Sequence, residues 1–270
     1  ILVVDSFSND KTVEFSKQMG VTVLQNKWRS HSDQFNWALS LIKNKYEWVF
    51  RVDADEYLSE ELISEIHAKL NNKKVGINGI YIKRIINFFG RDIRFGGVGN
   101  IYVLRIFRSR YGFLENRLMD EHFIIIGKTI KFNGTIIDRN LNNIDWWVLK
   151  HLRYASLEAI EMLDLEYNIL KNKDKLNALS GLKLSKGFKR IVKNSIYASM
   201  PTVFRSLVYF LYRYLILFGF LDGFKFHFLQ SFWYRFIVDV KINQVRKFIK
   251  DEKVSPKKAI KSVLNIDLHN

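Results

Sequence analysis

Apolar and mixed segments alternate over the first part of the chain, and the alternation predicts strands separated by helices. Apolar runs at Ile1–Val4, Val21–Leu24 and Trp48–Val52 have the character of buried strands. The segments between them predict one helix that ends near Met19 and another over Phe35–Ile42. These elements together predict an α/β domain with a mostly parallel sheet.

The chain begins inside an apolar run, at Ile1 rather than at a methionine. Natural chains seldom start in the middle of a core strand, so we expect upstream sequence that this chain lacks. The first strand of the domain would lie in that upstream part. An N-terminal targeting segment would lie there too, so its absence here carries no meaning.

Further elements follow the third apolar run. Ser59 is suited to cap a helix that reaches about Leu70. Residues 79–134 predict mainly strands, a helix is expected over Trp146–Lys171, and the basic, polar residues 171–193 predict a linker or surface segment. The strands expected within the middle segment are Ile80–Arg84, Tyr102–Arg108 and Ile130–Phe132.

Two apolar segments near the C-terminus carry narrow polar stripes. Val203–Leu221 is interrupted by Arg205, Tyr209 and Arg213, which recur every four residues, and Phe226–Val245 repeats this design. A spanning helix needs about 20 residues with few charges, so the stripes favour helices that lie in a membrane interface with their cations at the headgroups. The alternative is two core helices of a helical appendage. The second stripe consists of His227, Ser231, Arg235 and Asp239.

Composition and charge narrow the class of protein. Hydrophobic residues make up 48% of the 270, which allows a large core and disfavours disorder. The absence of cysteine excludes disulfides and thiolate metal sites. The formal charge is +16, of which +5 lies in residues 1–150 and +11 in residues 151–270. The basic C-terminal part predicts an anionic partner: nucleic acid, anionic lipid or a phosphorylated acceptor.

The strongest chemical signal is the run Arg51-Val52-Asp53-Ala54-Asp55-Glu56 at the end of an apolar strand. Its three carboxylates repel one another, and a cation that prefers hard oxygen ligands, such as Mg²⁺ or Mn²⁺, would relieve the repulsion. A second polar loop, Asp5–Thr12, also follows a strand. Because α/β sheets bind ligands at the carboxyl ends of their strands, the two loops predict a ligand-binding crevice.

These loops resemble the motifs of family 2 glycosyltransferases with the GT-A fold. Asp5, Ser8 and Asp10 match an Asp-x-x-Ser-x-Asp pattern, with Asn where Thr is common, and Asp53 and Asp55 match an Asp-x-Asp motif. Other segments are similar to enzymes that build bacterial surface polysaccharides and lipopolysaccharide. These segments are Ser32–Leu39, Met119–His122, Lys150–Ala159 and Tyr212–Arg235.

The resemblance implies a domain organisation. Residues 1–170 would form a GT-A nucleotide-sugar-binding domain that lacks its first strand. Residues 171–270 would form a basic, aromatic-rich helical region that associates with a membrane.

The resemblance also implies which residues bind donor and metal. Asp5 would hydrogen-bond the nucleotide base, Asp53 would contact the ribose or a metal-bound water, and Asp55 would ligate a divalent cation, Mg²⁺ or Mn²⁺. His151 is a candidate third metal ligand or a diphosphate contact, and equally a structural histidine. The expected donor-binding set is Asp5, Ser8, Asp10, Asn36 and Asp53, and the expected metal set is Asp53, Asp55 and His151.

Inversion at the sugar requires a base that takes the proton of the acceptor hydroxyl. Glu121 is the first choice for this base and Asp120 the second, because they lie in the segment that resembles the acceptor side. The alternative is that Glu121 pairs with Arg117 on a surface loop. Arg105 and Arg108 are either acceptor-phosphate contacts or solvated strand charges.

The sequence therefore predicts an inverting, metal-dependent glycosyltransferase of the hexosyltransferase type. Its partners would be a nucleotide-sugar donor, a lipid-linked saccharide acceptor and an anionic membrane surface, with no nucleic acid. It would be a peripheral protein at the cytoplasmic face of the inner (plasma) membrane, active in cell-surface polysaccharide synthesis. The alternatives are a catalytically inactive scaffold of the same fold and a basic nucleic-acid-binding protein, although no nucleic-acid motif is recognised.

Overall fold

The computed structural model describes residues 1–70, 76–99, 101–115, 121–169 and 202–268. The chain divides into two compact units. The first comprises residues 1–85 and 101–138, and the second comprises residues 86–100 and 139–270. This division differs from the expected boundary at residue 170, because the long helix that follows residue 143 packs within the second unit on the C-terminal helices.

The first unit opens with a strand–helix–strand crossover. Strands β1 (Leu2–Asp5) and β2 (Thr22–Gln25) pair in parallel, and helix α1 (Thr12–Gln18) connects them. Helix α1 ends before Gly20, whose φ of 72° lies in the left-handed region that glycine adopts without strain. Helix α2 (His31–Ile42) follows, capped by the Ser30 hydroxyl, which accepts from the Asp33 amide. It begins four residues earlier than the apolar pattern indicated.

In the larger sheet every register that the structure gives is antiparallel, so the expectation of a mostly parallel sheet is wrong. Its strand order is β3-β7-β5-β10-β4, with β6 paired to β5, and the registers of β3 on β7, β7 on β5, β5 on β6 and β10 on β4 are all antiparallel. Antiparallel strands need only a tight turn, whereas parallel pairs need a crossover, and the described residues between 76 and 143 contain no helix. The strands are β3 (Trp48–Phe50), β4 (Glu56–Leu58), β5 (Ile77–Phe88), β6 (Arg91–Ile93), β7 (Ile101–Arg108) and β10 (Lys128–Arg139).

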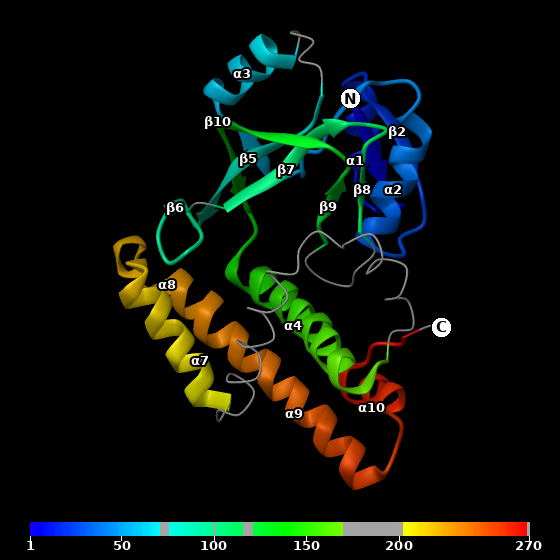
Figure 1. Ribbon diagram of the computed structural model, residues 1–270. Helices are drawn as coiled ribbons and strands as arrows, with labels where there is room; N and C mark the ends of the chain where they lie inside the picture. Colours follow the sequence, from blue (N-terminus) through cyan, green and yellow to red (C-terminus); the bar gives the residue numbers. More distant parts are fainter. Residues whose placement is uncertain (71–75, 100, 116–120, 170–201, 269–270) are drawn as a thin grey trace. The chain divides into compact units, whose positions relative to one another are not determined.

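Alternating side chains give this sheet two apolar faces, each covered by a helix. Leu62 of α3 (Glu60–Leu70) packs on the face that contains Ile80 and Ile82 of β5. Leu39 of α2 packs on the opposite face, which contains Phe107 of β7. The Ser59 hydroxyl caps α3 as expected, because it accepts a hydrogen bond from the Leu62 amide at 3.2 Å. Figure 1 shows α3 lying along the strands β5 and β10.

The approach of α3 to the sheet is so close that one strand position requires glycine. A Cβ built on Gly134 of β10 would lie 2.3 Å from the Cα of Leu62. Any larger residue would push the helix off the sheet, because backbone atoms cannot move aside as a flexible side chain can. Strands β8 (Gly112–Leu114) and β9 (Phe123–Ile125) form a separate antiparallel pair beside α2.

The second unit is built mainly of helices. Helix α4 (Ile144–Tyr167) packs on α9 (Tyr234–Glu252), and α7 (Thr202–Leu211) also packs on α9, as Figure 1 shows. Ion pairs from Glu158 to Arg235 and from Glu166 to Arg246 join α4 to α9. The remaining helical segments are η1 (Tyr212–Ile216), η2 (Gly219–Asp222), α8 (Phe224–His227), η3 (Phe228–Trp233) and α10 (Pro256–Leu264).

The two polar stripes of this unit face inward. The guanidinium of Arg205 is buried and donates from Nε to the buried carboxylate of Asp239 at 2.8 Å. Arg213 is buried too and donates to the Gly96 carbonyl at 2.6 Å. His227 and Ser231 are fully buried. The expectation that these stripes carry cations at lipid headgroups is therefore wrong for Arg205 and Arg213, because the interior satisfies their donors.

The apolar side chains of the same segment point outward instead. Within the described residues no helix is long and apolar enough to cross a membrane. Large apolar side chains are nevertheless exposed along α7, η1, η2 and the start of α8. We call this set the apolar band; it consists of Phe204, Leu207, Val208, Leu211, Tyr212, Leu215, Ile216, Phe218, Phe220, Leu221 and Phe224.

Candidate functional site

The carboxylate of Asp5 organises the loop that follows β1. It accepts from the Phe7 amide at 2.9 Å, from the Ser8 hydroxyl at 2.5 Å and from the Gln25 side chain of β2 at 2.9 Å. The hydrogen bond from Ser8, followed by that from Gln25, lowers the pKa of Asp5 below its ordinary value. Asp5 and Ser8 therefore bond to each other and fold this loop, and their contacts to a donor stay predictions.

A second set of bonds joins this loop to the start of α2. The side-chain amide of Gln34 donates to the Ser6 hydroxyl at 3.0 Å and accepts from the side-chain amide of Asn26 at 3.0 Å. Gln34 is buried, so its amide needs these partners. The carboxyl ends of β1 and β2 are thereby fixed to one helix, which gives the predicted crevice a rigid edge.

Two other residues of the expected donor-binding set have structural contacts. Asp10 accepts from the Thr12 amide at 3.0 Å at the start of α1, and the hydrogen bond from Thr12 lowers the pKa of Asp10. The amide of Asn36 donates to the Leu114 carbonyl at 2.7 Å and accepts from the Leu114 amide at 3.0 Å, which docks β8 on α2. The donor contacts of Asp10 and Asn36 stay predictions.

The acidic loop after β3 is built around two arginines. Arg51 donates to Asp53 through Nε at 3.1 Å and through Nη2 at 2.9 Å. Arg105 of β7 donates to Asp53 at 3.1 Å and also forms an ion pair with Glu56, whose side chain is only 1% exposed. Burial alone would raise the pKa of Asp53, but the charges of Arg51 and Arg105 hold it below the ordinary value. The carboxylate of Asp53 is therefore ionised, and the two arginines fix its orientation.

A β-bulge explains why Arg105 reaches this loop. On β5, Ile80 pairs with Ile106 and Tyr81 pairs with Leu104, so Arg105 is the extra residue on β7. A bulge bends the strand and redirects the side chain of the extra residue. Arg105 is consequently buried with its neighbours and forms ion pairs with the acidic loop. The alternative that it is a solvated strand charge is wrong, and it is not placed as a free contact for acceptor phosphate.

Asp55 differs from its acidic neighbours because its charge is uncompensated. Among the described residues no hydrogen bond or ion pair engages its carboxylate, and the side chain is half-exposed at the turn before β4. The same described residues contain no group of three or more histidine, aspartate or glutamate side chains placed to hold a metal ion. A cation at this loop would therefore use one or two protein carboxylates, which is the usual arrangement for Mg²⁺ when phosphates and waters supply the other ligands.

Glu121 lies beside the acidic loop although it is far away in sequence. Its Oε2 is 4.0 Å from Nδ1 of His31, the first residue of α2. Burial lowers the pKa of His31 below 6.5, and the nearby charge of Arg51 lowers it further. Arg51 in turn lies over the ring of Phe123, with 5.7 Å between its Cζ and the ring centroid. Glu121 and the acidic loop therefore both lie near His31 and Arg51 in the first unit, and their catalytic and metal roles stay predictions.

The remaining sequence candidates lie elsewhere. Asp120 and Arg117 fall outside the described residues, as does the expected linker at 171–193. His151 belongs to α4 in the second unit, where its Nδ1 donates to the Trp147 carbonyl at 2.8 Å and its ring stacks on Trp147. Burial lowers the pKa of His151, so the ring is neutral at pH 7 and Nε2 is an acceptor. Its metal role stays a prediction.

Sequence reasoning missed two residues that shape the site, His31 and Gln34, and it gave the bulged Arg105 another role. His31 and Gln34 have no motif of their own, and their roles depend on where α2 lies relative to the loops. Arg105 carried one usable signal, which is a charge inside an otherwise apolar strand. Such a charge costs free energy unless it is paired, so it indicates a buried partner.

Comparison with known proteins gives one family match and several relatives. Residues 1–131 match the family described as glycosyl transferase family 2. An uncharacterized glycosyltransferase of Rickettsia felis is 42% identical over 66 residues, which are 24% of this chain and 23% of that protein. One from Rickettsia typhi is 26% identical over 175 residues, 60% of this chain and 59% of that protein. The chain thus spans from about a quarter to less than two thirds of the length of these relatives. The match implies a GT-A type α/β fold for residues 1–131.

Proposed function

We propose that this chain, whose residues 1–131 match glycosyl transferase family 2, is an inverting hexosyltransferase that uses a nucleotide-sugar donor. One observation carries the proposal. The carboxylates of Asp53 and Asp55 follow β3, and Glu121 lies 4.0 Å from His31, whose pKa responds to the charges of Arg51 and Asp53. This arrangement supports a crevice in which Asp53 and Asp55 lie on the side of the leaving group and Glu121 lies on the side of the acceptor.

The reaction needs one proton acceptor and one stabilised leaving group. The acceptor hydroxyl oxygen attacks the anomeric carbon, the bond from that carbon to the diphosphate oxygen breaks, and the nucleoside diphosphate leaves with the electron pair. Glu121 takes the hydroxyl proton. Attack from the face opposite the leaving group inverts the configuration. A neutral His31 next to Glu121 leaves the carboxylate basic, because it adds no full positive charge.

The residues present fit a divalent cation, Mg²⁺ or Mn²⁺, at this site. Asp55 offers an oxygen pair with no partner among the described residues, while the two arginines hold Asp53 in a fixed direction next to it. When bound, such a cation supplies Lewis-acid stabilisation of the leaving diphosphate. The ion pairs of Arg51 and Arg105 keep the acidic loop folded, so the loop needs no reorganisation when the donor arrives.

The metal role of Asp55 can be tested by donor binding. We expect Mn²⁺ to strengthen the binding of UDP- or GDP-sugars to the unmodified chain, and we expect Asp55→Ala to remove that strengthening. The physical reason is that Asp55 is the one carboxylate of this loop that no side chain in the described part of the chain neutralises. Isothermal titration calorimetry with Mn²⁺ and with EDTA measures the effect.

The control for this experiment is Glu60→Ala. Glu60 is an exposed carboxylate at the start of α3, so the variant loses the same charge near the loop without removing a ligand. Equal donor affinity in Mn²⁺ and in EDTA for the unmodified chain, or a Mn²⁺ effect that survives in Asp55→Ala, would contradict the metal role.

The apolar band supports an anionic membrane surface as a partner. Its side chains face outward while the polar groups of the same helices are buried, which is the reverse of a helix in water. The basic charge of residues 151–270 adds attraction to anionic lipid. A lipid-linked saccharide acceptor at the cytoplasmic face of the plasma membrane, in cell-surface polysaccharide synthesis, is consistent with such docking.

Vesicle flotation tests the membrane partner. We expect the chain to float with vesicles of phosphatidylcholine and phosphatidylglycerol, and we expect Ile216→Ser with Phe224→Ser to reduce the floating fraction severalfold. These side chains are 65% and 53% exposed, and each would lose its transfer from water into the lipid interface.

Matched control substitutions exist in the same unit. Leu149 and Leu165 of α4 are 66% and 62% exposed but lie outside the apolar band, so Leu149→Ser with Leu165→Ser should leave flotation unchanged. The membrane proposal fails if the chain floats no better with anionic vesicles than without vesicles. It also fails if both pairs of substitutions have the same effect.

A further inference from the structure

The first unit contains a hollow on the edge opposite the acidic loop. It has a volume of about 370 Å³ and lies between the C-terminal end of α2 and the turn after β7. Trp48, the first residue of β3, pairs with Arg108 there, whereas the acidic loop follows the last residue of β3. Asp53 lies five positions after Trp48, which in an extended chain is roughly 16 Å. The hollow is therefore distinct from the candidate active site.

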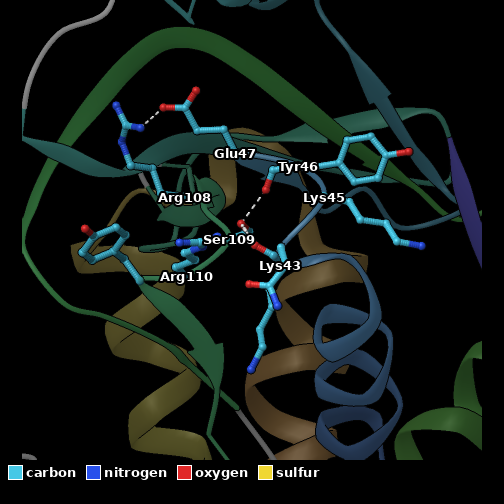
Figure 2. A pocket seen from close by; sticks show the side chains of 9 residues that line it. Lys43, Lys45, Tyr46, Glu47, Arg108, Ser109 and Arg110 are labelled. Atoms are coloured by element: carbon cyan, nitrogen blue, oxygen red, sulfur yellow. Dashed lines mark hydrogen bonds and ion pairs between the residues drawn. The ribbon is translucent and has the colours of Figure 1, made fainter.

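The lining of this hollow is strongly cationic. Four cations face one carboxylate, and that carboxylate, Glu47, is already paired with Arg108. For Lys43, Lys45 and Arg110, no ion pair with another described residue is present. These three positive charges at the wall of the hollow have no described anionic partner, so their combined field favours an anion there. Figure 2 shows Arg110 beside Ser109, Lys43 and Lys45 extending away from Ser109 in different directions, and Arg108 turned toward Glu47.

The frame of the hollow is rigid. Ser109 is buried, and its hydroxyl hydrogen-bonds the carbonyls of Lys43 at 2.9 Å and Tyr46 at 2.5 Å. The Ser109 amide donates to the Glu47 carbonyl at 2.9 Å. These bonds cover carbonyls at the end of α2 that would otherwise repel an anion. The backbone that carries the cations is thus set before any ligand binds.

Two aromatic rings add an apolar component. Tyr46 and Tyr111 line the hollow and are 61% and 44% exposed. Exposed tyrosines offer ring faces for the C–H groups of a sugar and hydroxyls for its polar groups. The volume lies in the range of small-ligand pockets, about 300–1,000 Å³. Cations and tyrosines together match a sugar ring that carries a phosphate.

We propose that this hollow is a second binding site of the first unit, for a phosphate-bearing saccharide. Arg110 and Lys43 bind the phosphate, and the tyrosines contact the sugar. Arg108, committed to Glu47 and stacked on Trp48, holds the wall of the site. The site does not depend on the proposed transferase activity, because it uses none of the residues of the acidic loop.

The probes for this site are pyrophosphate and glucose 1-phosphate. Each is titrated into the full chain, and its binding is measured by the changes in the backbone amide NMR shifts. We expect saturable shifts at residues 43–47 and 108–111. Arg110→Gln and Lys43→Gln should each weaken the binding of glucose 1-phosphate at these amides about tenfold, since each removes one charge-assisted hydrogen bond. The matched control is Lys17→Gln, which removes a cation from the last turn of α1 and should change nothing.

The other outcomes overturn the proposal. Shifts confined to residues 5–10 and 53–56 would place the probes in the candidate active site only. Equal binding of uncharged glucose would remove the role of the cations. Shifts at the hollow with vesicles of phosphatidylglycerol but with neither soluble probe would make it a lipid headgroup site rather than a saccharide site. Unchanged affinity in both Arg110→Gln and Lys43→Gln would contradict the assigned contacts.

Discussion

Glu121→Gln is expected to lower kcat by about 10²–10⁴-fold while leaving donor affinity nearly unchanged, because general-base catalysis typically contributes that much. The substitution keeps the size and hydrogen-bonding capacity of the side chain but removes its basic lone pair. Donor binding should persist because the acidic loop is held by Arg51 and Arg105, and not by Glu121. Turnover of a nucleotide sugar with a saccharide acceptor and calorimetric donor binding measure the two quantities separately.

Two control variants separate Glu121 from its neighbours. His31→Gln removes the imidazole that lies 4.0 Å from Glu121, and it should lower turnover less than Glu121→Gln if His31 only positions the carboxylate. Asp120→Asn tests the adjacent acid. If His31→Gln or Asp120→Asn abolishes turnover while Glu121→Gln retains it, the base is that residue instead. If all three variants retain turnover, the proton goes to a group outside this segment.

Arg105→Leu is expected to destabilise the first unit by about 3–5 kcal/mol, which is the usual cost of leaving a buried charge without its partner. The side chains of Arg105 and Glu56 are 5% and 1% exposed, so water cannot replace the lost guanidinium. Urea unfolding followed by circular dichroism measures the loss. Arg108→Leu is the control, because its partner Glu47 is 66% exposed and such pairs contribute about 0–1 kcal/mol.

The pH dependence of this loss has a definite sign. Burial already raises the pKa of Glu56 above its ordinary value, and removing the nearby cation raises it further. A carboxyl group whose pKa is higher in the folded chain than in the unfolded chain loses stability as the pH rises. The penalty of Arg105→Leu should therefore be smaller at pH 5 than at pH 8.

The double variant Arg105→Leu with Glu56→Leu completes the test of the buried pair. It removes both charges, so it should recover a large part of the lost stability. A double variant as unstable as Arg105→Leu would mean that the loss came from packing rather than from an unpaired carboxylate. A loss below 1 kcal/mol for Arg105→Leu would mean that water reaches Glu56.

Much of the local structure follows from the sequence because it depends on neighbouring residues. The strand at Leu2–Asp5, the Ser59 cap and the helix over Ile144–Tyr167 all match their sequence signals. The polar loop at Asp5–Thr12 and the acidic loop at Asp53–Glu56 were also recognisable, because each places carboxylates directly after an apolar strand. The family match over residues 1–131 agrees with the resemblance based on those loops.

Two features could not be predicted from neighbouring residues: the antiparallel pairing of the strands, and the burial of the polar stripes on the C-terminal helices. An apolar strand such as Ile77–Phe88 looks the same in a parallel and an antiparallel sheet, and only its pairing with β6 and β7 decides. Similarly, a stripe of Arg205 and Arg213 on an apolar helix can face lipid headgroups or a polar interior. The partners that settled the matter, Asp239 and Gly96, are distant in sequence.

The sequence by itself determined the elements, the chemical character of the two loops and the choice of Glu121 as the base to test. Only the tertiary structure placed His31 beside Glu121, redirected Arg105 into the acidic loop through a bulge and left Asp55 as the carboxylate with no partner in the described chain. The physical reason is the distance along the chain over which each interaction acts. Apolar periodicity and capping act over a few residues, whereas the charge that each carboxylate carries into a reaction is set by cations that the fold brings from far along the chain.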